Sequence, residues 1–260
     1  KDENIGKMEH LDAATLEEFM AYHKTYYGPN NAVLIVAGDI DTQETIGLVK
    51  KYFDEVPRGN EVVRNFPKEE PISENVRAIA YDRNIQIPML LSSFRTPGFA
   101  SRDSYVLDMI STYLSSGKSS VLYKKLVDDQ KQALQTQVIN LGQVDYNIFA
   151  ILALPLGDVS LDTLLAEIEE EIEKVQKELI SERDHQKLLN KFESQFVNSN
   201  SSIAGIANSL ARYYLLYGDV NLINKEIDIY RSISREEIRS VAQKYLSPNQ
   251  RVDIEYLPGE

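Results

Sequence analysis

The stretch Ser234-Arg-Glu-Glu-Ile-Arg-Ser-Val-Ala-Gln-Lys-Tyr-Leu-Ser-Pro-Asn-Gln-Arg-Val-Asp-Ile254 decides how this chain folds, because Thr15–Ile35, 219 residues earlier (234 − 15 = 219), repeats its design. Each copy opens with Ser/Thr-x-x-Glu, the capping-box pattern that satisfies the first free N–H groups of a helix. Each then carries apolar side chains at helical spacing, a Pro-Asn pair that ends the helix, and a strand-like segment, which is apolar at 32–37 and alternates between apolar and polar residues at 251–256. The sequence therefore predicts two helix–turn–strand units, with strands at 32–37 and 251–256. Chance similarity is the weaker alternative, because cap, breaker and strand all match in register.

Hydrophobic periodicity places further elements between the two copies. Alternating or continuous apolar runs predict strands, and apolar residues three and four apart predict helices. The expected strands are 77–81, 86–94, 133–141 and 146–154, and the expected helices are 42–56, 103–114, 121–129, 161–179, 182–198, 203–217, 222–231 and 236–245. Strand pairs on both sides of helices, followed by a helical run and a returning strand, predict an α+β fold, with a mixed or antiparallel sheet packed by helices.

The repeat also predicts the domain organisation. A long stretch of structure precedes the second copy, whereas only fourteen residues precede the first, so we expect a two-domain repeat whose first domain is truncated. Residues 1–56 are the C-terminal tail of that first domain, and residues 77–260 are a whole second domain. The segment 57–76 between them holds three prolines, many charges and little periodicity, as a linker does.

The composition excludes several classes of chemistry. The 260 residues include 40 acidic and 28 basic side chains, a net charge of −12, which disfavours nucleic acid as a partner. There is no cysteine, so disulfides, thiolate zinc sites and thiol nucleophiles are excluded. The longest apolar run, 148–156, is about half of the ~18 residues that a spanning helix needs, so no membrane span is expected.

One loop resembles a phosphate-binding motif. Ser116-Gly-Lys-Ser119 matches the end of the pattern, but Thr112 stands where the first glycine is needed and a helix precedes the loop. A helix-capping loop explains these residues better, and nucleotide binding is not assigned.

The metal-binding residue types are scattered. Glu182 and His185 share a helix face, but one carboxylate and one imidazole are at most half of a zinc site, and His10 and His23 lie far away in sequence. The five carboxylates within Glu167–Glu173 are expected to form the solvated face of an amphipathic helix. No catalytic residue and no metal ligand is therefore assigned.

Two strings resemble a known family. Thr15-Leu-Glu-Glu-Phe19 with Tyr26-Tyr-Gly-Pro-Asn-Asn31 is similar to the segment after the zinc site of the insulinase/pitrilysin-like metallopeptidases, the H-x-x-E-H inverzincins. Gly117-Lys-Ser-Ser-Val-Leu-Tyr-Lys-Lys-Leu126 resembles a block in the second domain of that family, and the whole chain resembles the C-terminal portion of a compact bacterial-type, two-domain member. The resemblance implies a clamshell of two α+β domains, in which an unfolded peptide lies as an added strand on a sheet edge.

The resemblance also implies where zinc belongs. In active members two histidines of H-x-x-E-H and a distant glutamate bind zinc, and the motif glutamate acts as general base toward the metal-bound water. No H-x-x-E-H occurs in this sequence, so no cofactor is expected in this chain and it should be inactive alone. Zinc is implied for the full-length protein or for its partner.

The family block further implies which residues face substrate. By their place in and after the block, these are Lys118, Ser119, Ser120, Tyr123, Gln135 and Gln137. Active members place an Arg and, seven residues later, a Tyr against the substrate, whereas this sequence has Val127 and Leu134 at those positions.

The leading hypothesis is the C-terminal, non-catalytic half of a zinc metallopeptidase, which pairs with a zinc-bearing domain or subunit of the same family and contacts unfolded peptide. Val127 and Leu134 keep a second hypothesis open, a catalytically inactive scaffold or partner subunit of a processing-protease-like complex. A peptide-binding module is a third. A homodimer and a heterodimer both stay open, and so do the bacterial cytoplasm and periplasm.

Overall fold

The computed structural model describes residues 6–63, 65, 67 and 70–259. Residues 1–5 of the predicted domain tail, residues 64, 66, 68 and 69 of the predicted linker, and residue 260 lie outside the described residues. The chain forms two compact units, 1–69 with 200–220, and 70–199 with 221–260. No helix in the described ranges combines the length and the apolar character needed to cross a membrane.

The first unit is helical. Its elements are α1 (Met8–Ala13), α2 (Leu16–Tyr26), the 3₁₀ turn η1 (Pro29–Asn31), α3 (Thr42–Phe53), α7 (Ile203–Arg212) and the π-helix η3 (Tyr213–Tyr217). Thr15 caps α2 and Asp41 caps α3 through their side-chain oxygens, as the sequence predicts. Asn30 ties the Pro-Asn turn to the following segment, because its Oδ1 accepts from the Gly59 N–H at 2.8 Å.

The strand predicted at 32–37 is wrong. These residues form neither helix nor strand, although their sequence is as apolar as that of a strand. A strand must exchange backbone hydrogen bonds with a neighbour, and the described residues of this unit provide no strand beside it. The exposed side chains of Leu34 and Val36 reflect the missing partner.

The second unit contains the sheet. Its strands are β1 (Val76–Asp82), β2 (Met89–Pro97), β3 (Ala133–Leu141), β4 (Tyr146–Pro155) and β5 (Arg251–Pro258). Its helices are α4 (Arg102–Ser115), the π-helix η2 (Tyr123–Asp129), α5 (Leu161–Lys177), α6 (Glu182–Ser199), α8 (Leu222–Arg231), α9 (Arg235–Tyr245) and the 3₁₀ turn η4 (Pro248–Gln250). The predicted elements of this unit are confirmed, with β2 beginning at residue 89 instead of 86.

The strand order is β1-β5-β2-β4-β3. β1 pairs with β5 in parallel, and the other neighbouring pairs are antiparallel, so the sheet is mixed. The last strand of the chain, β5, therefore lies inside the sheet between β1 and β2, whereas β3 is an edge strand of the described sheet.

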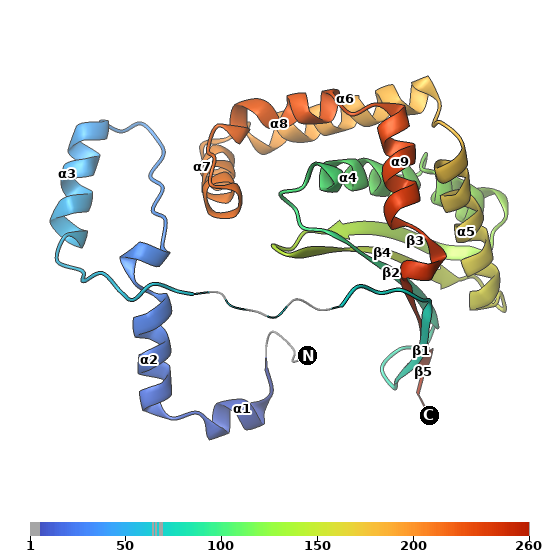
Figure 1. Cartoon of the computed structure of the whole chain (residues 1–260), viewed down its shortest axis with the longest axis horizontal. Helices are drawn as coiled ribbons and strands as arrows, with labels where there is room; N and C mark the ends of the chain where they lie inside the picture. The colour runs from blue at the N-terminus through green and yellow to red at the C-terminus, as the bar shows by residue number, and fades with distance from the viewer. Residues whose placement is uncertain (1–5, 64, 66, 68–69, 260) are drawn as a thin grey trace. The chain divides into compact units, whose positions relative to one another are not determined.

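Helices α4, α5 and α9 cover one face of the sheet, and α6 and α8 lie on the far side of α4 (Figure 1). The core forms between this face and the helices. Phe94 of β2 lies opposite Phe149 of β4 in the register, their rings meet edge to face at 6.3 Å, and both are almost fully buried. From α5, Leu164, Ile168 and Ile172 are buried at helical spacing.

β5 presents its charged residues to the helices. Arg251 and Asp253 are 3% and 2% exposed, whereas Val252 and Ile254 lie on the opposite face of the sheet. The buried charges are paired, since Arg251 contacts Asp253 at 2.8 Å and Glu169 of α5 at 2.5 Å. Ser92 adds a hydroxyl donor to Asp253 at 2.5 Å.

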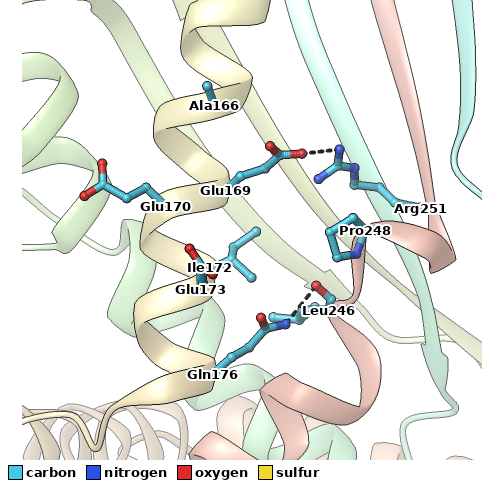
Figure 2. A pocket seen from close by; sticks show the side chains of 9 residues that line it. All are labelled: Ala166, Glu169, Glu170, Ile172, Glu173, Gln176, Leu246, Pro248 and Arg251. Carbon is cyan, nitrogen blue, oxygen red and sulfur yellow. Dashed lines mark hydrogen bonds and ion pairs between the residues drawn. The ribbon is translucent and has the colours of Figure 1, made fainter.

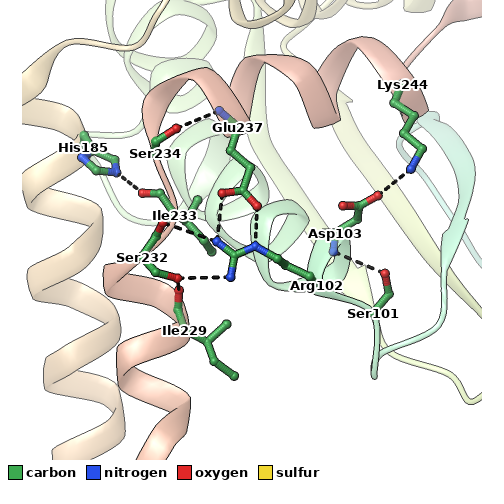
Figure 3. A network of polar contacts seen from close by, with 10 residues as sticks. All are labelled: Ser101, Arg102, Asp103, His185, Ile229, Ser232, Ile233, Ser234, Glu237 and Lys244. Carbon is green, nitrogen blue, oxygen red and sulfur yellow. Dashed lines mark hydrogen bonds and ion pairs between the residues drawn. The ribbon is translucent and has the colours of Figure 1, made fainter.

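The second capping box works differently from the prediction. Ser234 caps α9 by accepting from the Glu237 N–H at 3.2 Å, but the Glu237 carboxylate does not return to the cap. It accepts instead from Arg102 of α4 at 2.6 and 3.0 Å (Figure 3). In the first copy, Glu18 does close the box by accepting from the Thr15 N–H at 2.8 Å.

Candidate functional site

The loop between α4 and η2 presents two of the predicted substrate-facing side chains. Lys118 and Ser119 are exposed. Gly117 has φ +83°, which favours glycine, and a Cβ built there would meet nothing within 4 Å, so the loop surface is open at this point. Ser120 is 2% exposed, and its hydroxyl donates to the Gly117 carbonyl at 2.7 Å, so it supports the loop from within.

The helix after the loop is wound as a π-helix from Tyr123. The Gln130 N–H donates to the Lys125 carbonyl, five residues back, at 2.9 Å. Leu126 of this helix is buried, while Tyr123 and Val127 are half-buried. Single π turns occur frequently at functional sites, and the apolar spacing of the sequence does not distinguish them from α-helix.

β3 carries the remaining predicted residues. Gln135 and Gln137 are both exposed and both point to the face of the sheet opposite the helices, since they alternate with buried Thr136 and Val138. Leu134 lies at an irregularity: the register shifts between Ala133 and Gln135, so Leu134 has no partner on β4 and is 45% exposed. A bulge of this kind re-aims a side chain at the edge of a sheet.

The outer edge of β3 is partly closed by α4. The Val138 N–H donates to the Ser115 hydroxyl oxygen at 2.6 Å, and the Ser115 Oγ lies 3.2 Å from the Val138 carbonyl. One serine thus occupies both backbone groups of Val138 on the side away from β4. The tie also joins the loop, which begins directly after Ser115, to the edge strand.

Two lysines of α6 hold the same loop, which the sequence analysis did not detect. The Lys187 ammonium donates to the Ser119 carbonyl at 3.1 Å, and Lys191 donates to the Ser116 carbonyl at 3.5 Å and to its hydroxyl. The spacing of four residues places both lysines on one face of α6. Only the fold brings that face to a loop about seventy residues earlier, so no local signal marks it.

A surface hollow of about 440 Å³ lies between α5 and the turn from α9 to β5 (Figure 2). Ile172, Leu246 and Pro248 form its apolar part, and Arg251 lies at one end, paired with Glu169. Its polar groups are already engaged: Gln176 donates to the Leu246 carbonyl at 3.0 Å. The hollow therefore lies at the edge of the contact between the second repeat copy and α5.

The acidic stretch of α5 is only partly solvated. Glu171 is 7% exposed and, with Glu167 and Glu170, surrounds the Lys125 ammonium at 2.9, 2.8 and 2.6 Å. Burial alone lowers the pKa of Lys125, but the three carboxylates raise it above its usual value. Hydrogen bonds from Lys125 and Lys174 lower the pKa of Glu170 to about 2. This cluster anchors η2, and with it the preceding loop, to α5.

The histidines have structural partners. The His185 ring nitrogen Nε2 lies 2.9 Å from the Ile233 carbonyl (Figure 3), and Glu182 pairs with Arg235 at 3.2 Å. His23 stacks on Tyr27 at 5.1 Å. No three His, Asp or Glu side chains of the described residues converge as metal ligands. These residues therefore do not fit a zinc ion.

Comparison with known proteins identifies the family. Residues 13–192 match the model of the peptidase M16 inactive domain. The chain belongs to this family. The prediction of an insulinase-like, non-catalytic C-terminal domain is thereby confirmed, as is its α+β fold.

Individual relatives agree with the family. A zinc protease of Helicobacter pylori, PqqE, is 27% identical over 252 residues, which are 96% of this chain and 56% of that protein. The crystal structure of a protease from Helicobacter pylori superposes with a TM-score of 0.88 at 25% identity, covering 97% of this chain and 61% of that one. The M16 inactive domain from Pseudomonas fluorescens shares the fold, with a TM-score of 0.82 at 13% identity over 98% of this chain and 60% of that one.

The chain thus spans about half the length of the curated relatives that it matches. The zinc-protease names of these relatives do not favour the alternative of a scaffold subunit.

Proposed function

We propose that this M16 inactive domain forms one wall of a peptide-binding chamber and that a zinc-bearing domain or subunit of the same family supplies the hydrolytic chemistry. Zinc then belongs to that half, and the described residues of this chain hold no site for it. Unfolded peptide is the substrate class. The segments 1–56, 57–76 and 77–260 are, in this proposal, the tail of the zinc-bearing domain, the linker and the non-catalytic domain.

The observation that carries the proposal is the continuity of loop, π-helix and edge strand. The exposed loop residues Lys118 and Ser119 connect through η2 to β3, and Ser115 ties the start of the loop back to Val138. Gln135 and Gln137 add amide donors and acceptors on exposed positions of the same strand. Such groups suit the backbone of an extended peptide, which offers both N–H and C=O.

The residues at the two replaced family positions limit the polar contacts that this wall can make with substrate. Val127 is half-buried in η2, and Leu134 is exposed at the bulge of β3. Neither side chain donates a hydrogen bond, so we expect apolar packing against substrate at Leu134 instead of polar contact. Among the predicted substrate-facing residues, Tyr123, four residues before Val127, is the hydroxyl donor nearest to Val127 in sequence.

Photo-crosslinking with an unstructured peptide tests the proposal. A neutral peptide that carries a photoreactive phenylalanine analogue at its centre should bind the whole chain and crosslink within 116–123 and 133–137. Leu134→Arg should shift or abolish the β3 crosslinks, while Val36→Arg, also at an exposed aliphatic residue, serves as control. Crosslinks confined to other surfaces would contradict the proposal, as would stoichiometric zinc in the purified chain or peptide cleavage by it alone.

A further inference from the structure

The lysines that hold the 116–120 loop have donor capacity to spare. An ammonium group carries three N–H donors and no acceptor. Lys187 uses one donor on the Ser119 carbonyl, and Lys191 directs its donors to Ser116 alone. Lys187 is exposed and Lys191 is half-buried, so at least the first presents its remaining donors to solvent beside the open loop.

The positive charge at this loop is not neutralised. Neither lysine forms an ion pair with a carboxylate of the described residues, and the same holds for the exposed Lys118 of the loop itself. Burial and the neighbouring Lys187 charge lower the pKa of Lys191, which indicates two ammonium groups that repel each other. Lys125, by contrast, is surrounded by three carboxylates.

The positive charges of Lys187 and Lys191 contrast with the negative net charge of the chain. The chain has a net charge of −12, so as a whole it repels anions at long range. Carbonyl groups hold Lys187 and Lys191 in place but leave their charge in full. The ammonium groups of Lys187 and Lys191, against a loop that also carries the exposed Lys118 and is open at Gly117, therefore make a place where a carboxylate is attracted.

We propose that Lys187, Lys191 and Lys118 form a carboxylate-binding site at the peptide wall. The ligand is a carboxylate of a bound peptide, either an Asp or Glu side chain or the C-terminal carboxylate. The carboxylate accepts from the free N–H groups of Lys187 and is attracted by the other two charges. This inference rests on the proposed function, because it names which peptides that wall prefers.

Matched peptides separate the two sources of the carboxylate. One unstructured sequence is made in a neutral form with Gln and an amidated C-terminus, a form with Glu in place of Gln, and a form with a free C-terminus. Fluorescence anisotropy with the whole chain should show about tenfold tighter binding for one charged form than for the neutral form, the size of one charge-assisted hydrogen bond. Binding of the neutral form with no preference for either charged form would keep the proposed function and overturn this inference.

Lysine variants locate the effect. Lys187→Gln should lower the ratio of charged-peptide to neutral-peptide affinity toward one, and Lys187→Arg, which keeps the charge, should restore that ratio. Lys177→Gln is the matched control, because Lys177 is an exposed lysine of α5 that pairs with Glu173. An equal loss in Lys177→Gln would show general electrostatics and contradict a specific site.

Acetate provides a readout that needs no peptide. Titration with sodium acetate against sodium chloride at constant ionic strength should shift the Cε resonances of Lys187 and Lys191 in ¹H–¹³C spectra, assigned from the Gln variants, and leave Lys177 unmoved. Shifts at the two lysines without binding of any peptide would support the carboxylate site while the proposed function fails. Equal response of all three lysines to acetate would overturn the site.

Discussion

Phe19 of α2 and Ile238 of α9 occupy the same position in the two copies of the repeat, yet Phe19 is 54% exposed and Ile238 is 1% exposed. The helices themselves are alike: each has 11 residues and a hydroxyl cap, and each ends before a Pro-Asn turn. The strands differ, since 251–258 forms β5 whereas 32–37 forms none. Caps and breakers therefore act locally in both copies, but burial and strand formation require tertiary partners, which the described residues supply only to the second copy.

The largest expected difference in stability change is between variants of Leu34 and Asp253, which occupy the same strand position in the two repeat copies. Asp253→Ala removes the buried one of the two carboxylates that pair with Arg251 and leaves only the more exposed Glu169, and breaking a buried pair from one side costs about 3–5 kcal/mol. Leu34→Ala should change the free energy of unfolding by less than about 0.5 kcal/mol, because the side chain is exposed. Chemical denaturation, monitored in each unit by hydrogen exchange, measures the stability change of both variants. Replacing Arg251 and Asp253 together by Met and Leu should recover much of the loss, and no recovery would mean that the charges are needed for more than mutual pairing.

The helix position gives the next largest difference. Ile238→Ala removes a fully buried side chain and should lower the stability of the second unit by about 2–4 kcal/mol. Phe19→Ala should cost less than about 1 kcal/mol in the same chain, although phenylalanine is the larger side chain. Urea titrations of both variants make the measurement. Equal losses would show that Phe19 is covered in solution and would break the comparison.

Replacing the two capping glutamates should have effects that differ in how far they extend through the structure as well as in size. Glu237→Gln weakens a paired contact to Arg102 of α4 and should cost about 1 kcal/mol, with the added exchange appearing in both α9 and α4. Glu18→Gln should cost less than about 0.5 kcal/mol, because glutamine also closes a capping box and the contact is local. Amide exchange resolved by helix distinguishes the two. A loss confined to α9 would contradict the role of Glu237 as a tie between helices.

The smallest expected effect is a dependence of stability on pH in the second unit, where Glu170 lies. The pKa of Glu170 is lowered from 4.5 to about 2 by Lys125 and Lys174, so its stabilising contribution is complete above pH 4.5 and is lost as the pH falls toward 2. Thermal melts should therefore separate wild type from Glu170→Gln at neutral pH and converge near pH 2. A constant gap across this range would show that the carboxylate contributes through packing, not through charge.

The sequence predicts local structure well where one signal suffices. The strand at 133–141 and the helix at 222–231 have the predicted bounds, although the bulge at Leu134 interrupts the alternation of the strand. The strand at 32–37 failed because its apolar pattern contains no information about a partner. The six-residue helix α1 was not predicted, since it has too few turns to show a period.

The candidate site was predictable in outline only. The family block located the loop and strand, but it did not show that Ser120 is buried or that Leu134 lies at a bulge. A bulge changes the register by one residue and depends on strand pairing, which no local pattern encodes. Lys187 and Lys191 were missed for the same reason, because their contact with the loop exists only in the folded domain.

The place of β5 in the sheet has a consequence for how the protein is made. β5 comes last in chain order among the described strands, yet it lies in the sheet between β1 and β2, which come first and second. During translation β2, β3 and β4 can already form an antiparallel sheet, while β1 must wait through some 170 residues (251 − 82 = 169) for its only partner in the described sheet. At ~5–20 residues per second, that wait lasts on the order of ten to thirty seconds. The growing chain therefore exposes an unpaired β1 and an open edge of β2 for that period.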